Sequence, residues 1–321
     1  MTGLAPAPSG RPILGRRFTF IVGSSRSGTT WLQALLGAHP SVASSSELQL
    51  FSQYVAPMMR AWRFHERDSM PAGLPLVFSE AEFMERLDRL VQDSFGRVLE
   101  TKPEADMILA KIPQYRGGVE ILERFLPGAR YVHLIRDGRD VASSLIAASR
   151  GWGKNWAPQD VAAAARWWRN GVEAARTAGR FPGRYLELRY EDLLGDTANV
   201  LEGILEFLDL DRDAGLLGTL IDQGRFDRMK QGKLLGAYDL PDGFVRTGRS
   251  ANWVTELPAI DRYAFHLEAG RLLSDLGYAD EGWWRSRSWH RLSVPVAHAL
   301  SEPGLRGKLR TLLRLGKRVS A

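Results

Sequence analysis

Hydrophobic residues form five short runs, separated by longer segments with helical spacing. The runs are brief and apolar, β-branched or aromatic, which favours buried strands; they span 18–22, 41–43, 107–111, 130–135 and 184–188. The intervening segments repeat apolar residues every three or four positions, as helices do; they span 30–38, 81–97, 119–125, 141–149, 161–178 and 197–208. Because strands alternate with helices, we predict an α/β protein with three layers and a central, mostly five-stranded parallel sheet flanked by helices. Ligands of such sheets bind beyond the carboxyl ends of the strands.

The composition fits a globular domain and excludes several kinds of site. Hydrophobic residues make up 44% of the 321 residues, enough for a sizeable core, and cysteine is absent, which excludes disulfides and thiolate chemistry. The six histidines are scattered, so we expect no metal site. No apolar run approaches the length of a membrane span, and residues 1–17 show no signal-peptide pattern. We therefore expect a cytoplasmic protein.

Positive charge is concentrated at the end of the chain. Residues 283–321 hold nine Lys or Arg and one acid, so the rest of the chain, within a total of +6, is close to neutral. We predict a flexible segment over 1–16, the main domain over 17–282 and a basic helical extension over 283–321. The extension is amphipathic, which fits peripheral contact with an anionic inner membrane face or packing on its own domain. The near-neutral body gives no indication of a nucleic-acid partner.

The first candidate site is the Ser- and Gly-rich segment 23–31, which joins the first strand to the first helix. Small residues let the backbone approach an anion, and the N–H groups of a helix N-terminus point towards it. Arg26 adds a fixed positive charge, and Thr29 and Thr30 add hydroxyl donors. This order of strand, tight loop and helix makes the expected fold P-loop-like. The Walker A motif needs Lys after its last Gly, but here Thr29 follows Gly28, so the loop suits an anionic nucleotide bound without a metal.

The second candidate site follows the fourth strand. Arg136 ends the strand and Ser144 lies eight residues further on, in the next helix, so the two can hold a second anion. Between them, we expect Arg139 and Asp140 to form surface salt bridges.

The two loops, in this order, resemble the donor site of sulfotransferases that use 3′-phosphoadenosine 5′-phosphosulfate (PAPS) and release PAP. The resemblance implies that segment 26–31 contacts the 5′-phosphosulfate, that Trp31 stacks on the adenine, and that Arg136 and Ser144 hold the 3′-phosphate. Two later segments, around Tyr190 and over 246–249, resemble the family's adenine contact and its closing 3′-phosphate loop. The implied donor-binding residues are Arg26, Ser27, Gly28, Thr29, Thr30, Trp31, Arg136, Ser144, Tyr190, Arg246, Thr247, Gly248 and Arg249.

The resemblance also suggests the catalytic groups. Cytosolic members use a His two residues after a Lys on the third strand, but here Pro113 follows Lys111 at that spacing. The tyrosylprotein branch uses a Glu 21 residues after the loop Arg, which is Glu47 here. The expected mechanism is in-line transfer to an acceptor hydroxyl or amine, with Glu47 as the base and with Arg26 and Lys111 stabilising negative charge. His39 and His133 are expected to be a turn residue and a strand residue.

The acceptor is not identified by any motif. Trp62, Trp152 and Trp156 are candidates for an acceptor pocket, whereas Trp167 and Trp168 have the spacing of core residues. A small molecule, a lipid or a glycan is the expected class of partner. Two alternatives are a P-loop-like nucleotide kinase and a nucleotide-binding protein without catalytic activity.

Overall fold

A computed structural model describes most of the domain predicted over 17–282. The described residues are 13, 15–45, 47–67, 72–115, 117–230, 233–234, 238–239, 241–245, 248–280 and 282–284. The predicted N-terminal segment and basic extension lie outside the described residues, except for residues 13, 15, 16, 283 and 284.

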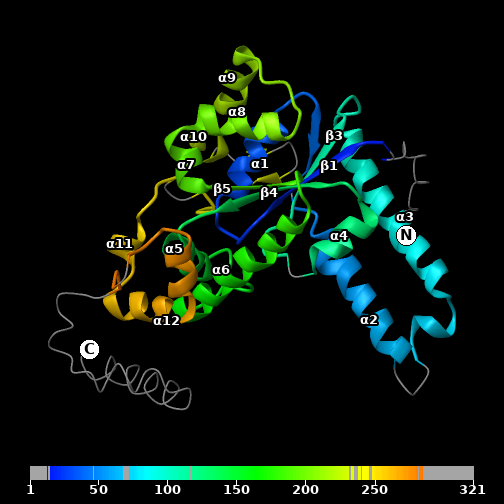
Figure 1. The fold of residues 1–321 in the computed structure, drawn as a ribbon, viewed down its shortest axis with the longest axis horizontal. Helices are drawn as coiled ribbons and strands as arrows, with labels where there is room; N and C mark the ends of the chain where they lie inside the picture. Colours follow the sequence, from blue (N-terminus) through cyan, green and yellow to red (C-terminus); the bar gives the residue numbers. More distant parts are fainter. Residues whose placement is uncertain are drawn as a thin grey trace.

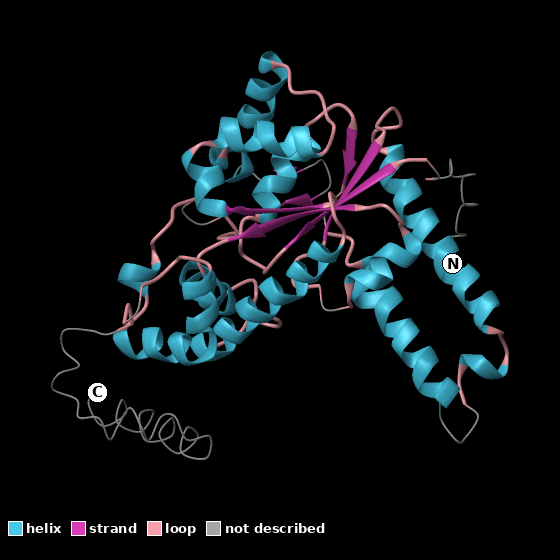
Figure 2. Cartoon of the chain, in the orientation of Figure 1, coloured by secondary structure: helices cyan, strands magenta, loops and turns pink. Residues whose placement is uncertain are grey.

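The centre of the fold is a five-stranded sheet in which every pairing is parallel (Figures 1 and 2). The strand order is β2-β3-β1-β4-β5, with β1 Arg17–Val22, β2 Val42–Ser44, β3 Met107–Lys111, β4 Arg130–Ile135 and β5 Tyr185–Arg189. The predicted sheet is confirmed, and no predicted strand boundary is wrong by more than one residue. Strand β1 lies at the centre of the sheet, with β3 on one side and β4 on the other. Because the three strands are parallel neighbours, the loops that follow them meet at the same edge of the sheet.

Helices cover both faces of the sheet, as the alternation of side chains along β1 requires. Phe18 and Phe20 point into a core shared with α2 Ala56–Arg67, α3 Glu80–Glu100 and α4 Val119–Phe125. Ile21 points to the opposite face, against α1 Thr29–Gly37, α8 Thr197–Phe207 and α9 Ala214–Gln223. A third core joins the end of β4 to α5 Gly138–Ser149, α6 Val161–Arg176 and α12 Ala259–Asp275, at the lower left of Figure 1. The predicted three-layer α/β architecture is confirmed.

Shorter elements connect these layers. They are the π-helix η1 Leu50–Val55, the 3₁₀ helices η2 Leu74–Leu76 and η3 Thr177–Arg180, the helices α7 Tyr190–Gly195, α10 Phe226–Lys230 and α11 Trp253–Glu256, and the antiparallel pair β6 Lys233–Leu234 and β7 Tyr238–Asp239. Helices α2 and α12 were not predicted from the hydrophobic pattern. In the part of the chain that the structure describes, no helix is long and apolar enough to cross a membrane.

Candidate functional site

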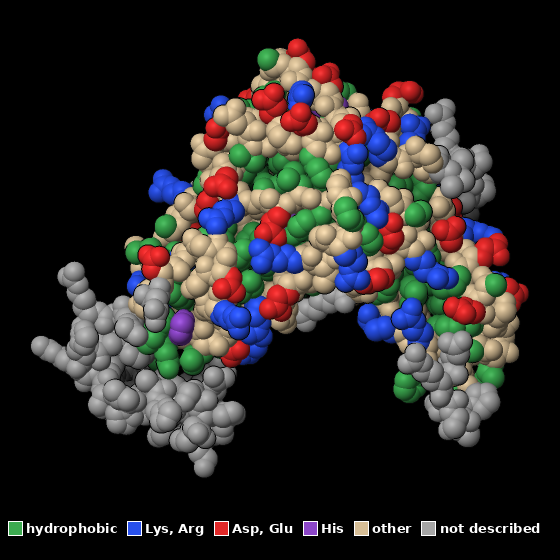
Figure 3. Space-filling view, in the orientation of Figure 1, with side chains coloured by type: hydrophobic (Ala, Val, Ile, Leu, Met, Phe, Trp, Pro, Cys, Tyr) green, Lys and Arg blue, Asp and Glu red, His purple; other side chains and the backbone are tan. Residues whose placement is uncertain are grey.

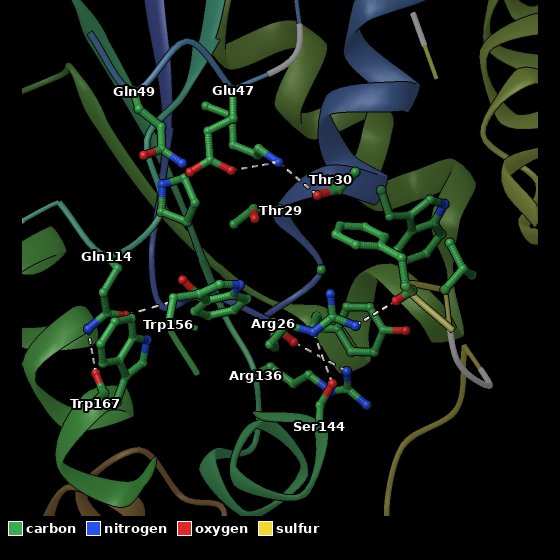
Figure 4. A pocket seen from close by; sticks show the side chains of 18 of the residues that line it. Arg26, Thr29, Thr30, Glu47, Gln49, Gln114, Arg136, Ser144, Trp156 and Trp167 are labelled. Atoms are coloured by element: carbon green, nitrogen blue, oxygen red, sulfur yellow. Dashed lines mark hydrogen bonds and ion pairs between the residues drawn. The ribbon is translucent and has the colours of Figure 1, made fainter. Parts of the chain in front are cut away.

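A cavity of about 550 Å³ lies at the carboxyl ends of β1, β3 and β4 (Figure 4). Its volume is in the usual range for a site that encloses a small ligand. The predicted site residues that line it are Arg26, Gly28, Thr29, Thr30, Trp31, Glu47, Lys111, Arg136, Ser144, Tyr190 and Gly248. The fold therefore brings both predicted anion loops and the predicted catalytic groups into one space.

The loop after β1 has a backbone that depends on glycine at its end. Gly28 is the N-cap of α1 with a φ of 94°, and a Cβ atom there would lie 2.5 Å from the Tyr190 ring. Arg26 is also left-handed, with a φ of 72°. The Ser27 hydroxyl is buried and has no hydrogen-bond partner among the described residues. A buried donor beside the unpaired N–H groups of a helix N-terminus suits an anion.

Lys111 and Glu47 meet in the cavity wall. The Lys111 Nζ donates to Thr30 Oγ1 over 2.8 Å and lies 3.4 Å from Glu47 Oε2. Lys111 is only 7% exposed, and its burial lowers the pKa of the ammonium group, an effect that the Glu47 carboxylate opposes. The group thus links the end of β3 to the first turn of α1 and to the segment after β2.

Arg26 lies across the cavity rather than over its own loop. Its Nε donates to Ser144 Oγ over 3.0 Å, and its Nη2 donates to the Phe244 carbonyl over 2.6 Å. Its guanidinium also lies 5.2 Å from the Trp152 ring centre and 4.8 Å from that of Phe244. The residues predicted to hold opposite ends of the donor, Arg26 and Ser144, are therefore bonded to each other in this structure.

Arg136 lies where the second loop meets the first. Its guanidinium carbon is 4.5 Å from the Tyr190 ring centre, and its Nη2 donates to the Arg249 carbonyl over 2.9 Å. Its Nε is buried without a hydrogen-bond partner in the described part of the chain. Arg249 therefore contributes a backbone carbonyl, and Arg246 and Thr247 lie outside the described residues.

Trp31 and Tyr190 combine packing with exposure to the cavity. Trp31 is 6% exposed, its Nε1 donates to the Gly224 carbonyl over 2.9 Å, and its ring packs against Tyr190 and Phe226. Trp31 therefore packs in the core and also offers part of its ring to a ligand in the cavity.

The expectation that Arg139 and Asp140 form surface salt bridges is wrong. Arg139 is 5% exposed and Asp140 is 1% exposed. Arg139 donates to the Asp137 carboxylate and stacks on the Trp253 ring at 3.8 Å. Asp140 accepts hydrogen bonds from the backbone of the segment after Gly248. The first turn of α5 faces the protein interior, and charged residues are stable there only because each is paired.

The aromatic wall of the cavity differs in part from the prediction. Trp152 and Trp156 line the cavity as predicted, and Trp167 lines it too, although its spacing suggested a core residue. Trp62 is buried outside the cavity and stacks on Phe83, with ring centres 4.4 Å apart. Trp168 is fully buried, as predicted.

Gln114 lines the cavity and is not among the predicted site residues. Its Oε1 accepts from Ser24 Oγ and the Ser25 N–H, both at 3.3 Å, and its Nε2 donates to the Trp167 carbonyl over 2.6 Å. It thus ties the first anion loop to helix α6. A left-handed φ of 59° at Gln114 makes this contact possible, and a local sequence pattern does not show it.

The two candidate histidines lie outside the cavity. His39 is a buried turn residue that accepts from the Ser41 N–H, as predicted. His133 is buried in β4 beside Tyr185, as predicted. On the face seen in Figure 3, acidic and basic side chains are interspersed.

Comparisons with known proteins identify the family. A sequence model of the sulfotransferase family matches residues 19–214, more than half of the chain. An uncharacterized protein of Aquifex aeolicus is 29% identical over 63% of this chain and 26% of its own length. The protein-tyrosine sulfotransferase 1 of Danio rerio is 30% identical over 40% of this chain and 34% of its own length. The chain thus spans about a quarter to a third of these two curated relatives.

Solved structures show the same fold. A sulfotransferase domain from the curacin biosynthetic pathway superposes with a TM-score of 0.55 at 23% identity, covering 82% of this chain and 98% of that one. A mouse sulfotransferase complexed with PAP superposes with a TM-score of 0.52 at 16% identity, covering 82% and 89%. The predicted family is confirmed: this chain belongs to the sulfotransferase family.

Proposed function

We propose that this chain transfers the sulfuryl group of PAPS to an acceptor hydroxyl, with Glu47 as the base. The observation that supports this most directly is the single cavity that contains both anion-binding loops together with Glu47 and Lys111. PAPS carries phosphate groups at two positions, so a site for it needs two groups of anion-binding residues. The acceptor hydroxyl needs a base within hydrogen-bond reach of its proton.

The cavity residues fit PAPS. The backbone N–H groups and hydroxyls at the start of α1, at Gly28, Thr29 and Thr30, line the cavity and suit the 5′-phosphate. The buried, unpartnered Nε of Arg136 suits the 3′-phosphate, together with Ser144. Trp31 and Tyr190 line the cavity where the adenine would lie between the two loops.

Arg26 can keep Ser144 as a partner when the donor binds. In this structure it donates to the Ser144 hydroxyl oxygen and to the Phe244 carbonyl. The Ser144 O–H can donate to a 3′-phosphate while its oxygen still accepts from Arg26. We propose that Arg26 turns towards the sulfuryl group because that group, unlike these two neutral acceptors, carries negative charge.

The proposed reaction uses three side chains: Glu47, Lys111 and Arg26. Glu47 takes the proton of the acceptor hydroxyl as the acceptor oxygen forms a bond to sulfur. The bond from sulfur to the phosphate oxygen breaks, and PAP leaves with that oxygen. Lys111 and Arg26 stabilise the negative charge that develops on the sulfuryl and bridging oxygens. Lys111 is suited to this because it contacts both Thr30 and Glu47.

The acceptor is proposed to be a small molecule, a lipid or a glycan with a free hydroxyl. The wall of Trp152, Trp156 and Trp167 offers flat apolar surface opposite Glu47. Peptide tyrosine, suggested by the name of the zebrafish relative, is tested in the same experiment. A kinase is disfavoured, because Thr29 occupies the place of the Walker lysine.

The test is transfer of ³⁵S from labelled PAPS to a panel of phenols, tyrosine peptides, glycans and glycolipids. The variants are Glu47→Gln and the matched control Glu85→Gln, an exposed residue on α3. We expect transfer by the wild type and by Glu85→Gln, and a kcat lower by roughly 10²- to 10⁴-fold in Glu47→Gln with unchanged PAP affinity. Wild-type turnover by Glu47→Gln would reject the base. Lack of PAP binding by the wild type, or magnesium-dependent phosphoryl transfer from ATP, would reject the function.

A further inference from the structure

Asp140, in the first turn of α5, holds a segment more than a hundred residues further along the chain. We call residues 248–253 the closing segment; its Gly248 and Asn252 line the cavity. Asp140 Oδ2 accepts from the Ala251 N–H over 2.8 Å, and Asp140 Oδ1 accepts from the Trp253 N–H over 2.9 Å. Both oxygens of one carboxylate are therefore used to fix the backbone of the closing segment.

The ion pair between Asp140 and Arg136 is secondary to these bonds. Asp140 Oδ2 lies 3.7 Å from Arg136 Nη2, longer than either bond to the closing segment. The nearer group to Arg136 Nη2 is the Arg249 carbonyl, at 2.9 Å. Arg136 and Asp140 thus hold the same segment from two sides, and Arg136 keeps its buried Nε unpartnered among the described residues.

The conformation of the closing segment needs such support. Ala251 has a φ of 62°, a left-handed value that is unfavourable for a residue with a Cβ atom. Ala251 itself is exposed, so packing around its side chain does not stabilise this value. The charge-assisted bond from Ala251 N–H to a carboxylate that is 1% exposed offsets the cost.

We propose that Asp140 is a positioning residue for the 3′-phosphate of the donor. It fixes the closing segment beside Arg136, so that Arg136 and the Gly248 and Asn252 of the segment line the same cavity. The inference rests on the proposed function, because it needs a nucleotide with a 3′-phosphate. Asp140 touches the closing segment rather than the ligand, so its effect reaches the ligand only through the segment and Arg136.

The test compares two nucleotides that differ only in the 3′-phosphate. Dissociation constants for PAP and for AMP are measured by calorimetry on the wild type, on Asp140→Asn and on the control Asp275→Asn, an exposed residue of α12. Asn keeps one acceptor oxygen and loses the other together with the charge. We expect the PAP affinity of Asp140→Asn to fall roughly ten-fold, with AMP affinity unchanged and with Asp275→Asn like the wild type.

A purely structural role gives a different result. In that case PAP and AMP affinities of Asp140→Asn fall together, which would overturn the inference, as would an unchanged PAP affinity. A wild type that binds PAP no better than AMP would instead reject the proposed function, and the inference with it.

A second measurement needs no variant and so does not depend on the folding of Asp140→Asn. Amide hydrogen exchange at Ala251 and Trp253 is followed in the wild type with saturating PAP and with saturating AMP. We expect PAP to slow exchange at both amides at least several-fold more than AMP does, because only PAP reaches Arg136 and the closing segment. Equal exchange rates with the two nucleotides contradict the proposal.

Discussion

The two ends of the cavity are built in different ways. The proposed donor end consists of two continuous segments, 23–31 and 136–144, each of which runs from the end of a strand into the first turns of the following helix. The proposed acceptor end is assembled from η1, from α2 and from the aromatic residues of the α5–α6 connection and α6. The donor end therefore depends on backbone geometry set by the sheet, whereas the acceptor end depends on side chains from separate elements.

Because the two ends are built differently, we expect them to respond differently to amino-acid substitutions. At the donor end, the glycine conformation at Gly28 and the direction of Arg136 are fixed by neighbours on both sides. At the acceptor end, Trp156 is 40% exposed and has few constraints. We expect substitutions at the donor end to change nucleotide affinity strongly and substitutions at the acceptor end to change acceptor KM moderately.

The largest effect on nucleotide binding is expected from Gly28→Ala. The new Cβ would lie 2.5 Å from the Tyr190 ring, and a φ of 94° is unfavourable for alanine, so the loop has to move. We expect PAP affinity to fall by at least about 100-fold, measured by calorimetry. The control Gly183→Ala has a φ of 72° with open space around its Cβ, so it should lower the melting temperature slightly and leave PAP affinity unchanged. Equal PAP affinity in both variants would show that the loop geometry is not required.

Arg136→Ala should have the next largest effect. It removes the partly buried guanidinium that lies over Tyr190, and with it the proposed charge-assisted contact to the 3′-phosphate. We expect PAP affinity to fall by roughly 10- to 100-fold while AMP affinity and acceptor KM stay the same. Arg130→Ala, at the start of the same strand, removes contacts to Phe207 and Asp209 and should affect stability only. An equal loss of AMP affinity in Arg136→Ala would mean that Arg136 does not contact the 3′-phosphate.

The same difference explains what the sequence could predict. The five strands and both anion loops follow from local patterns, because each loop lies directly after an apolar strand. Trp62 was misassigned because an isolated tryptophan carries no information on its partner, here Phe83 on another helix. Asp140 was misassigned for a related reason: its partners, the backbone N–H groups of Ala251 and Trp253, are more than a hundred residues away. Contacts of this kind depend on the fold as a whole and leave no periodic signal.

Trp156→Ala tests the acceptor end directly. Trp156 packs at 5.4 Å from Trp152 and 6.2 Å from Trp167, at the exposed edge of the aromatic wall. We expect acceptor KM to rise by roughly 3- to 10-fold, with PAP affinity unchanged, because one aromatic contact contributes about 0.5–1.5 kcal/mol. Trp62→Ala should do the opposite, lowering the melting temperature without changing either KM. If Trp156→Ala weakens PAP binding as well, the two ends are not separate.

Lys111→Met should change the stability of the fold only slightly, although it removes a proposed catalytic group. Burial lowers the pKa of Lys111 below its ordinary 10.5, so its charged form costs free energy in the folded state at neutral pH. Between the lowered pKa and 10.5 the unfolded chain binds more protons than the folded one, so the stability of the wild type rises with pH in that window. Methionine carries no charge, so it removes the free-energy cost of burying the ammonium group. Glu47 loses its ion-pair partner but is 31% exposed, so water can solvate its carboxylate. We expect transfer to be lost, the melting temperature to rise, and this pH-dependent gain to disappear.

Lys102→Met separates this effect from the loss of any partly buried lysine. Burial also lowers the pKa of Lys102, but its Nζ donates to the carbonyls of Gly37 and His39 at the end of α1, over 3.2 and 2.8 Å. Methionine removes the donor of the Gly37 carbonyl and leaves the His39 carbonyl with the Val42 N–H alone, so we expect the melting temperature to fall and transfer to continue. A clear fall in the melting temperature of Lys111→Met would mean that its bonds to Thr30 and Glu47 stabilise the fold more than burial of the charge destabilises it. Lys111 would then belong to the structural framework of the donor end as well as to the chemistry between the two ends.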